Sequence, residues 1–157
     1  MPVFRALRLD KSDGEFRREY VELDDADLPS VDDPDQPGTH PEVVVDVDYS
    51  TVNFKDALAV ADQSPIVRTW PMVPGIDLAG VVSSSDDPEV PVGQRVVVNG
   101  WGIGEESWGG LAQRARVRGS WTVPLPDGVS TAEAMAIGTA GYTSILCVLA
   151  LEEHHVT

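Results

Sequence analysis

Apolar and polar residues alternate along several short segments of the chain. In the segment Glu42–Tyr49, valines and a tyrosine at the odd positions are separated by residues that include Asp46 and Asp48. This period of two predicts a strand with one buried face and one face turned to water. Alternation or short apolar runs predict further strands at Val3–Leu9, Phe16–Leu23, Leu78–Ser83, Arg95–Asn99 and Leu111–Arg118. Short strands separated by glycine and proline turns favour a β-barrel or sandwich over βαβ units.

The pattern becomes helical near the C-terminus. Ser130 and Glu133 have the spacing of a capping box, which predicts a short helix that ends near Ile137. After Gly138 a second helix is predicted, whose apolar residues lie on nearly every side: Tyr142, Ile145, Leu146, Cys147, Val148, Leu149 and Leu151. A helix of this kind needs burial on several faces. We therefore expect it to pack against chain that follows Thr157 or against another subunit.

Negative charge dominates the composition. The chain has 26 Asp and Glu residues against 11 Lys and Arg residues, which gives a formal net charge of -15. Such a field repels phosphate backbones and excludes nucleic acid as a general partner. Acidic residues and prolines fill residues 24–41, for which we expect an exposed loop that is free to move. An aspartate-rich, lysine-poor surface fits a halophilic source; an acidic mesophilic protein is the alternative.

Length and residue types limit the class of protein further. A chain of 157 residues suits one domain with a core of its own. The single Cys147 rules out an internal disulfide. The longest apolar run, Ile145–Leu151, is too short to span a bilayer, and Arg5 and Arg8 interrupt the N-terminal apolar stretch where a signal peptide would need continuity. We expect a soluble cytoplasmic protein without a membrane partner.

Five strings of residues resemble those of one enzyme family. They are Val52-Asn-Phe-Lys-Asp-Ala-Leu58, Pro71-Met-Val-Pro-Gly-Ile-Asp-Leu-Ala-Gly-Val81, Val92-Gly-Gln-Arg-Val96, Gly100-Trp-Gly-Ile-Gly-Glu-Glu-Ser-Trp-Gly-Gly110 and Ala136-Ile-Gly-Thr-Ala-Gly-Tyr142. In this order they cover most of residues 43–151. The chain thereby resembles the zinc-independent medium-chain dehydrogenases/reductases, and within them the acrylyl-CoA reductase and quinone-oxidoreductase-like branch.

The resemblance implies a two-part enzyme of which this chain is one part. Residues 1–127 are expected to form a GroES-like, partly open β-barrel on the substrate side, with the acidic loop at 24–41. Residues 128–157 would be a helical segment leading to a Rossmann domain that the chain does not contain. That domain would bind NADPH. The glycines of Gly102-Ile-Gly104 do not replace it, because Ser107 stands where the nucleotide fingerprint needs a third glycine and no βαβ unit surrounds them.

A metal site is not expected. Zinc-dependent members of the resembled family have Cys where Asn53 stands and His where Ile76 stands, and a catalytic zinc ion needs about three protein ligands. The three histidines, His40, His154 and His155, lie in the acidic loop and at the chain end, where we expect them to be solvated.

Without a metal, the reaction implied is hydride transfer to the β-carbon of an unsaturated thioester, which needs donors at the developing oxyanion. Asn53, Lys55 and Asp56 are the candidate catalytic residues; the alternative is a local cap and turn network with a solvated lysine. Phe54 is expected beside the cofactor, where the family usually has Tyr, so it keeps a stacking face without a phenolic proton. Thr139 is expected near the nicotinamide, or as a helix cap.

Other residues have two interpretations each. Trp101, Trp108 and Arg68 are the candidate walls of the substrate pocket, although the tryptophans also suit plain packing. Asp77 either orients Asn53 or satisfies backbone amides in a tight turn. The stripe of Arg114, Arg116 and Arg118 would suit a CoA diphosphate, but such a stripe also pairs with nearby acids.

Two functions remain open from the sequence. The first is the catalytic half of an NADPH-dependent reductase for an acrylyl-CoA-like acyl-CoA or a quinone, expected to be a homo-oligomer and inactive as this fragment alone. The second is a stand-alone GroES-like interaction or assembly module without catalysis.

Overall fold

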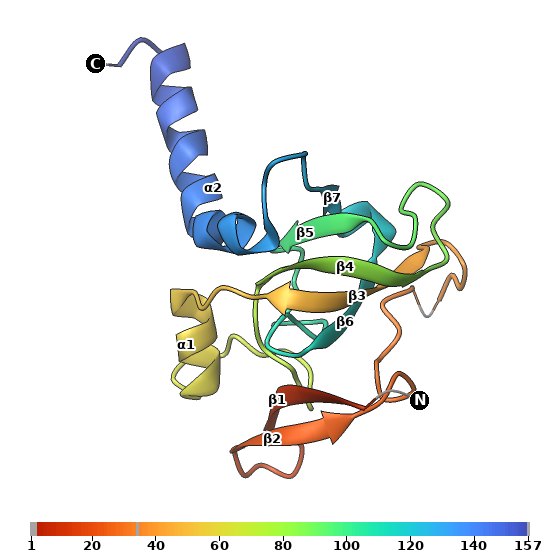
Figure 1. Ribbon diagram of the computed structural model, residues 1–157. Coiled ribbons are helices and arrows are strands. Elements are labelled where there is room, and N and C mark those ends of the chain that lie inside the picture. The colour runs from red at the N-terminus through yellow and green to blue at the C-terminus, as the bar shows by residue number, and fades with distance from the viewer. Residues whose placement is uncertain (1–2, 34, 157) are drawn as a thin grey trace.

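The computed structural model describes residues 3–33 and 35–156. Two sheets and two helices make up the fold (Figure 1). The strands are β1 (Phe4–Asp10), β2 (Arg17–Leu23), β3 (Glu42–Tyr49), β4 (Asp77–Ser85), β5 (Arg95–Asn99), β6 (Arg114–Arg118) and β7 (Val123–Pro124). The helices are α1 (Phe54–Val60) and α2 (Thr131–Glu153), with a 3₁₀ turn at Gly119–Trp121. β1 and β2 form a hairpin, and the larger sheet has the order β6-β3-β4-β5-β7.

The main core lies on one face of the five-stranded sheet. In the antiparallel register, Val45 of β3 stands opposite Val82 of β4 and Ala115 of β6, and all three are buried. The period of two predicted from the sequence places these side chains on one face. The chain therefore has the mainly β, GroES-like fold expected, with two sheets, no closed barrel, a C-terminal helix and no Rossmann unit among the described residues.

The predicted strands agree with the observed ones within a few residues, and the largest difference has a structural cause. The strand predicted from Leu111 begins only at Arg114. Leu111 and Gln113 bond to the hairpin instead: Leu7 N donates to Leu111 O and Gln113 N donates to Arg5 O, both at 2.9 Å. This segment joins the two sheets. The two-residue strand β7 was not predicted, because so short a segment has no detectable period.

The expectation of an exposed loop at residues 24–41 is wrong for its central part. Leu28 and Val31 are buried in the two larger core clusters. The arginine stripe of β6 holds this segment to the sheet: Arg116 Nη1 donates to Leu28 O at 2.9 Å, and Arg118 Nε donates to Val31 O at 2.7 Å. Arg114 pairs with Asp25 and Asp46, both at 2.7 Å. The arginine stripe thus binds groups of this chain, most of them in the acidic loop. This agrees with the second interpretation of the stripe, in which its partners belong to the protein.

Helix α2 stands away from the sheets and is bent near its start (Figure 1). Gly138 has φ 50° and ψ -167°, so the helical hydrogen bonding is interrupted there, between the two helices that the sequence predicted. The segment before the bend packs Ala134 and Met135 against Ala79 of β4. The segment after it leaves its large apolar side chains about half exposed: Tyr142, Ile145, Leu146, Val148, Leu149 and Leu151.

By length and composition, α2 could cross a membrane. Its most apolar 18-residue window has a mean hydropathy of 1.8, and 17% of that window is buried. The sequence expectation that no segment spans a bilayer considered uninterrupted apolar runs, whereas this window passes a test of length and composition alone. The bend at Gly138 leaves a straight segment, Thr139 to Glu153, of about 22 Å at 1.5 Å per residue. That is shorter than the hydrocarbon core of about 30 Å.

Candidate functional site

A buried carboxylate connects three segments at one end of the large sheet. Asp77, the first residue of β4, has no exposed surface. Its Oδ2 accepts hydrogen bonds from Asn53 Nδ2 at 2.9 Å and from Thr139 N at 2.8 Å. Its Oδ1 accepts from Asn99 Nδ2 at 2.9 Å and from the Thr139 hydroxyl. We call these four residues the Asp77 network; it brings the predicted residues Asn53 and Thr139 together.

The side chain of Asp56 is buried and is held by backbone amides. The carboxylate is 1% exposed and accepts three backbone N–H groups, from Asn53 at 2.7 Å, Gly75 at 3.1 Å and Ile76 at 3.0 Å. Asn53 and Asp56 also form the capping box that begins α1. Burial raises the pKa of Asp56, and the hydrogen bonds from these amides oppose that rise. Asp56 therefore holds α1 against the turn at residues 75–76, as the cap-and-turn interpretation proposed.

Asn53 keeps a donor that the network does not use. An amide nitrogen carries two hydrogens, and the bond to Asp77 occupies one of them. Lys55 Nζ lies 2.8 Å from Glu105 Oε1, in an ion pair of which the lysine side chain is 42% exposed. Phe54 is 80% exposed at the start of α1. An amide donor, an aromatic ring and a cation thus follow one another in the sequence at the exposed N-terminal edge of α1, which suits a reaction that develops negative charge beside a planar ring.

The three candidate pocket residues lie in or beside the glycine-rich loop, and Arg68 N donates at 2.8 Å to O of Glu105, the residue that pairs with Lys55. Trp101 is 62% exposed, has φ 58° and stacks on Trp121 with ring centroids 6.5 Å apart. Trp108 packs on the core cluster of the hairpin and donates from Nε1 to Pro71 O at 2.9 Å. Arg68 is an exposed partner of Glu106 at 3.6 Å. Their assignment to a substrate pocket stays a prediction.

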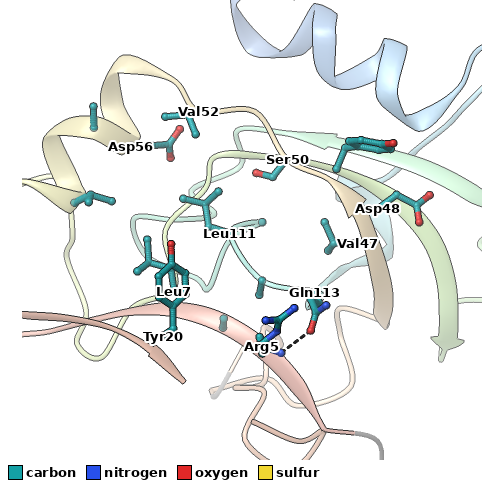
Figure 2. Close-up of a pocket in the computed structure, with 16 residues that line it drawn as sticks. Arg5, Leu7, Tyr20, Val47, Asp48, Ser50, Val52, Asp56, Leu111 and Gln113 are labelled. Atoms are coloured by element: carbon teal, nitrogen blue, oxygen red, sulfur yellow. Dashed lines mark hydrogen bonds between the residues drawn. The ribbon is translucent and has the colours of Figure 1, made fainter. Parts of the chain in front are cut away.

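A large open hollow lies between the hairpin and the end of β3 (Figure 2). Its volume is about 1030 Å³. Figure 2 shows Leu7 and Tyr20 of the hairpin, Val47 of β3 and Val52 before α1 around Leu111. Asp56 is the one predicted site residue that lines it. Nothing in the sequence pattern indicated this hollow, because its walls come from segments distant in the chain.

The described residues contain no group of three metal-ligating side chains. They also provide no free helix N-terminus for a pyrophosphate. Asp56 caps α1, Glu133 bonds Ser130 at the start of α2, and Asp77 accepts from Thr139 N where α2 resumes after Gly138. Each of these positions already holds a carboxylate, which repels a second anion. The phosphate end of a dinucleotide does not fit this chain, whereas the exposed Phe54 ring suits the nicotinamide end.

The sequence predicted most residues of this site but missed two of them. Asn99 and Glu105 were not predicted. Asn99 ends β5 directly opposite Asp77 in the strand register, and Glu105 reaches Lys55 from the glycine-rich loop. Both contacts depend on how strands and loops pair in three dimensions, for which a single sequence carries no direct signal.

Comparisons with known proteins agree with the fold. Residues 39–127 match the family described as alcohol dehydrogenase GroES-like domain. Over 95% of its length the chain is 47% identical to the probable acrylyl-CoA reductase AcuI of Escherichia coli, and over 97% it is 38% identical to the putative quinone oxidoreductase YhfP of Bacillus subtilis. The chain covers 43% of each of these relatives.

Solved structures show the same relationship. The yhdH oxidoreductase of Salmonella enterica, solved in complex with NADP, matches 95% of the chain with a TM-score of 0.84 and 48% identity, and the chain covers 43% of it. The YhdH protein of E. coli, solved with bound NADPH, matches with a TM-score of 0.85 and 46% identity, and the chain covers 44% of it. The chain therefore belongs to the alcohol dehydrogenase GroES-like domain family, and corresponds to the N-terminal half of the zinc-independent medium-chain reductases.

Proposed function

We propose that this chain is the substrate-side half of an NADPH-dependent, zinc-independent reductase that reduces an α,β-unsaturated acyl-CoA of the acrylyl-CoA type. The observation that carries the proposal is the Asp77 network, which joins Asn53, next to the exposed edge, to the start of the straight segment of α2. The identity of 47% to the acrylyl-CoA reductase of E. coli supports the substrate class.

The residues of this chain have distinct parts in the proposed reaction. Bound NADPH would supply a hydride to the β-carbon of the unsaturated thioester, which leaves negative charge on the thioester oxygen. Asn53 offers its unused amide hydrogen to that charge, and Lys55, held by Glu105, adds a positive field at the same edge. Phe54 gives the nicotinamide an exposed aromatic face but no proton. The proton that completes the product then comes from solvent or from a residue outside this chain.

The segment of α2 after Gly138 is the proposed contact with the nucleotide-binding half. Its six large apolar side chains stay about half exposed here, and the segment that bears them is anchored to the candidate site through Thr139. Burial of apolar side chains is the main favourable term in most protein association. The pyrophosphate would bind in that second half, since each helix N-terminus of this chain already has a carboxylate.

A chimera tests the proposed function. These residues replace the matched segment of the E. coli relative, and NADPH consumption is measured with acrylyl-CoA and with a quinone. We expect the chimera to reduce acrylyl-CoA, and Asn53→Leu to lower kcat about 100-fold through loss of an oxyanion donor. The matched control Glu89→Gln, on the exposed turn after β4, leaves kcat unchanged. The isolated chain is expected to bind no NADPH and to show no turnover.

The outcomes separate the candidate functions. Reduction of the quinone alone would replace the acyl-CoA by a quinone as substrate, which the likeness to YhfP favours. The exposed apolar side chains of α2 favour a second candidate, which is a module that assembles through this helix. A homo-oligomer is expected for both candidates. A chimera that binds NADPH but reduces neither substrate, with an isolated chain that assembles through α2, would support the module and contradict the reductase.

A further inference from the structure

The buried carboxylate of Asp77 accepts more hydrogen bonds than the proposed function requires. Asp77 accepts four hydrogen bonds from three different parts of the chain and has no exposed surface. No Lys or Arg side chain is paired with it among the described residues; the donors are two amides, one hydroxyl and one backbone N–H. A buried carboxylate that has only neutral donors depends on every one of them, because a buried charge that loses a hydrogen bond is left without compensation for its lost hydration.

The distribution of these bonds over the two oxygens links the site to α2. Oδ2 receives both the side chain of Asn53 and the backbone N–H of Thr139. A displacement of Thr139 moves the acceptor on which the orientation of the Asn53 amide depends. The neighbouring Gly138 leaves little room for adjustment, since a Cβ there would lie 3.1 Å from the same Oδ2.

We propose that Asp77 is a positioning residue that couples the direction of α2 to the orientation of Asn53. The proposal rests on the proposed function, in which α2 contacts the nucleotide-binding half and Asn53 faces the substrate. Asp77 itself touches neither substrate nor cofactor. Through it, the position in which the second half holds α2 is transmitted to the donor that meets the developing oxyanion, so that a displacement of α2 would misalign the donor.

The informative substitution is Asp77→Asn. It has nearly the same shape but one acceptor oxygen, and its amide nitrogen would face a donor, either Asn53 Nδ2 or Asn99 Nδ2. The network then loses at least one bond. Thr139→Val is the milder variant, because it removes the hydroxyl bond to Oδ1 and keeps the backbone N–H bond to Oδ2.

The first test uses the 157-residue chain and needs no activity. Spin labels on Cys147 of α2 and on Ser12→Cys in the turn after β1 report the distance between helix and hairpin. We expect one narrow distance distribution for the parent, a broadened one for Asp77→Asn, and a loss of at least tenfold in hydrogen-exchange protection at the Thr139 amide. Arg95→Leu is the matched control: it removes the 2.6 Å bond to Val129 O, another tether near α2, and should keep the distribution narrow.

The second test uses the chimera. Asp77→Asn is expected to lower kcat 10- to 100-fold while the KM for NADPH stays within about threefold, since residues that orient a catalytic group have effects of this size. Thr139→Val should lower kcat by less and in the same direction. Should Asp77→Asn fail to fold, Thr139→Val decides alone: a lower kcat with a broadened distribution supports the coupling, and the parental values of both contradict it.

The failure of this inference and the failure of the proposed function are distinguishable. An inactive parental chimera contradicts the function, while the spin-label distances still decide the structural coupling. An active chimera in which Asp77→Asn keeps its kcat and the narrow distribution overturns the coupling and leaves the function standing.

Discussion

Replacement of Asp56 by alanine is expected to lower the free energy of unfolding by at least about 3 kcal/mol, because two buried amides and one partly buried amide lose their acceptor at about 1–3 kcal/mol each. The variant leaves the N–H groups of Asn53, Gly75 and Ile76 without their acceptor. Gly75 and Ile76 are buried, so water reaches these amides poorly. Urea unfolding followed by circular dichroism measures the loss.

The exposed Asp48 provides the control for that variant. Asp48→Ala removes the same charge from the same end of the fold and should change the free energy of unfolding by less than about 0.5 kcal/mol. Equal effects of the two variants would show that charge alone, and not the three amides, accounts for the loss.

The raised pKa of Asp56 adds a pH dependence to this prediction. Because folding raises the pKa, the folded state holds the proton more tightly than the unfolded state does. The resulting stabilisation is fully present below the ordinary value of 3.8 and is lost as pH rises through the raised folded value. The stability of the parent relative to Asp56→Asn, measured across acid pH, should therefore fall as pH rises through this window.

Gly109→Ala is expected to cost more than about 3 kcal/mol, at the upper end of single substitutions. A Cβ at this position would lie 2.1 Å from Gly75 O and 2.9 Å from Gly104 N, and both atoms belong to the backbone. Relief requires the glycine-rich loop to separate from the turn at residues 75–76. That separation breaks the 2.9 Å bond from Gly110 N to Gly75 O.

The control for Gly109 is a glycine with strain but no close neighbour. Gly128 has φ 87° and nothing within 4 Å of an added Cβ, so Gly128→Ala reports left-handed backbone strain alone, roughly 1–2 kcal/mol. Thermal unfolding of both variants separates contact from strain. A smaller loss for Gly109→Ala than for Gly128→Ala contradicts the close packing of the loop on the turn.

Local patterns in the sequence predicted the elements that depend on neighbouring residues. The alternation in β3 placed Val43 and Val45 inside, and the spacing of Ser130 and Glu133 gave the capping box that begins α2. The break at Gly138 was likewise visible, because glycine interrupts an apolar helical pattern. Each of these depends on residues a few positions apart.

Partners distant in the chain were not predictable in the same way. Asp56 bonds amides about twenty positions later, and the β6 arginines bond a loop nearly ninety positions earlier. A single sequence shows that an acid and an arginine are available, but their pairing depends on the register of the strands. The hollow beside Leu111 was missed for the same reason: its walls meet only after the two sheets are placed together.

The central claim is that the apolar segment of α2 after Gly138 meets a nucleotide-binding half. Cys147, the single cysteine, is exposed on this helix and reports on the contact directly. The measurement is the rate at which a thiol reagent modifies Cys147 in the isolated monomeric chain and in the chimera. The account predicts rapid modification in the isolated chain and at least tenfold slower modification in the chimera. Equal rates in a folded chimera that reduces acrylyl-CoA would contradict it.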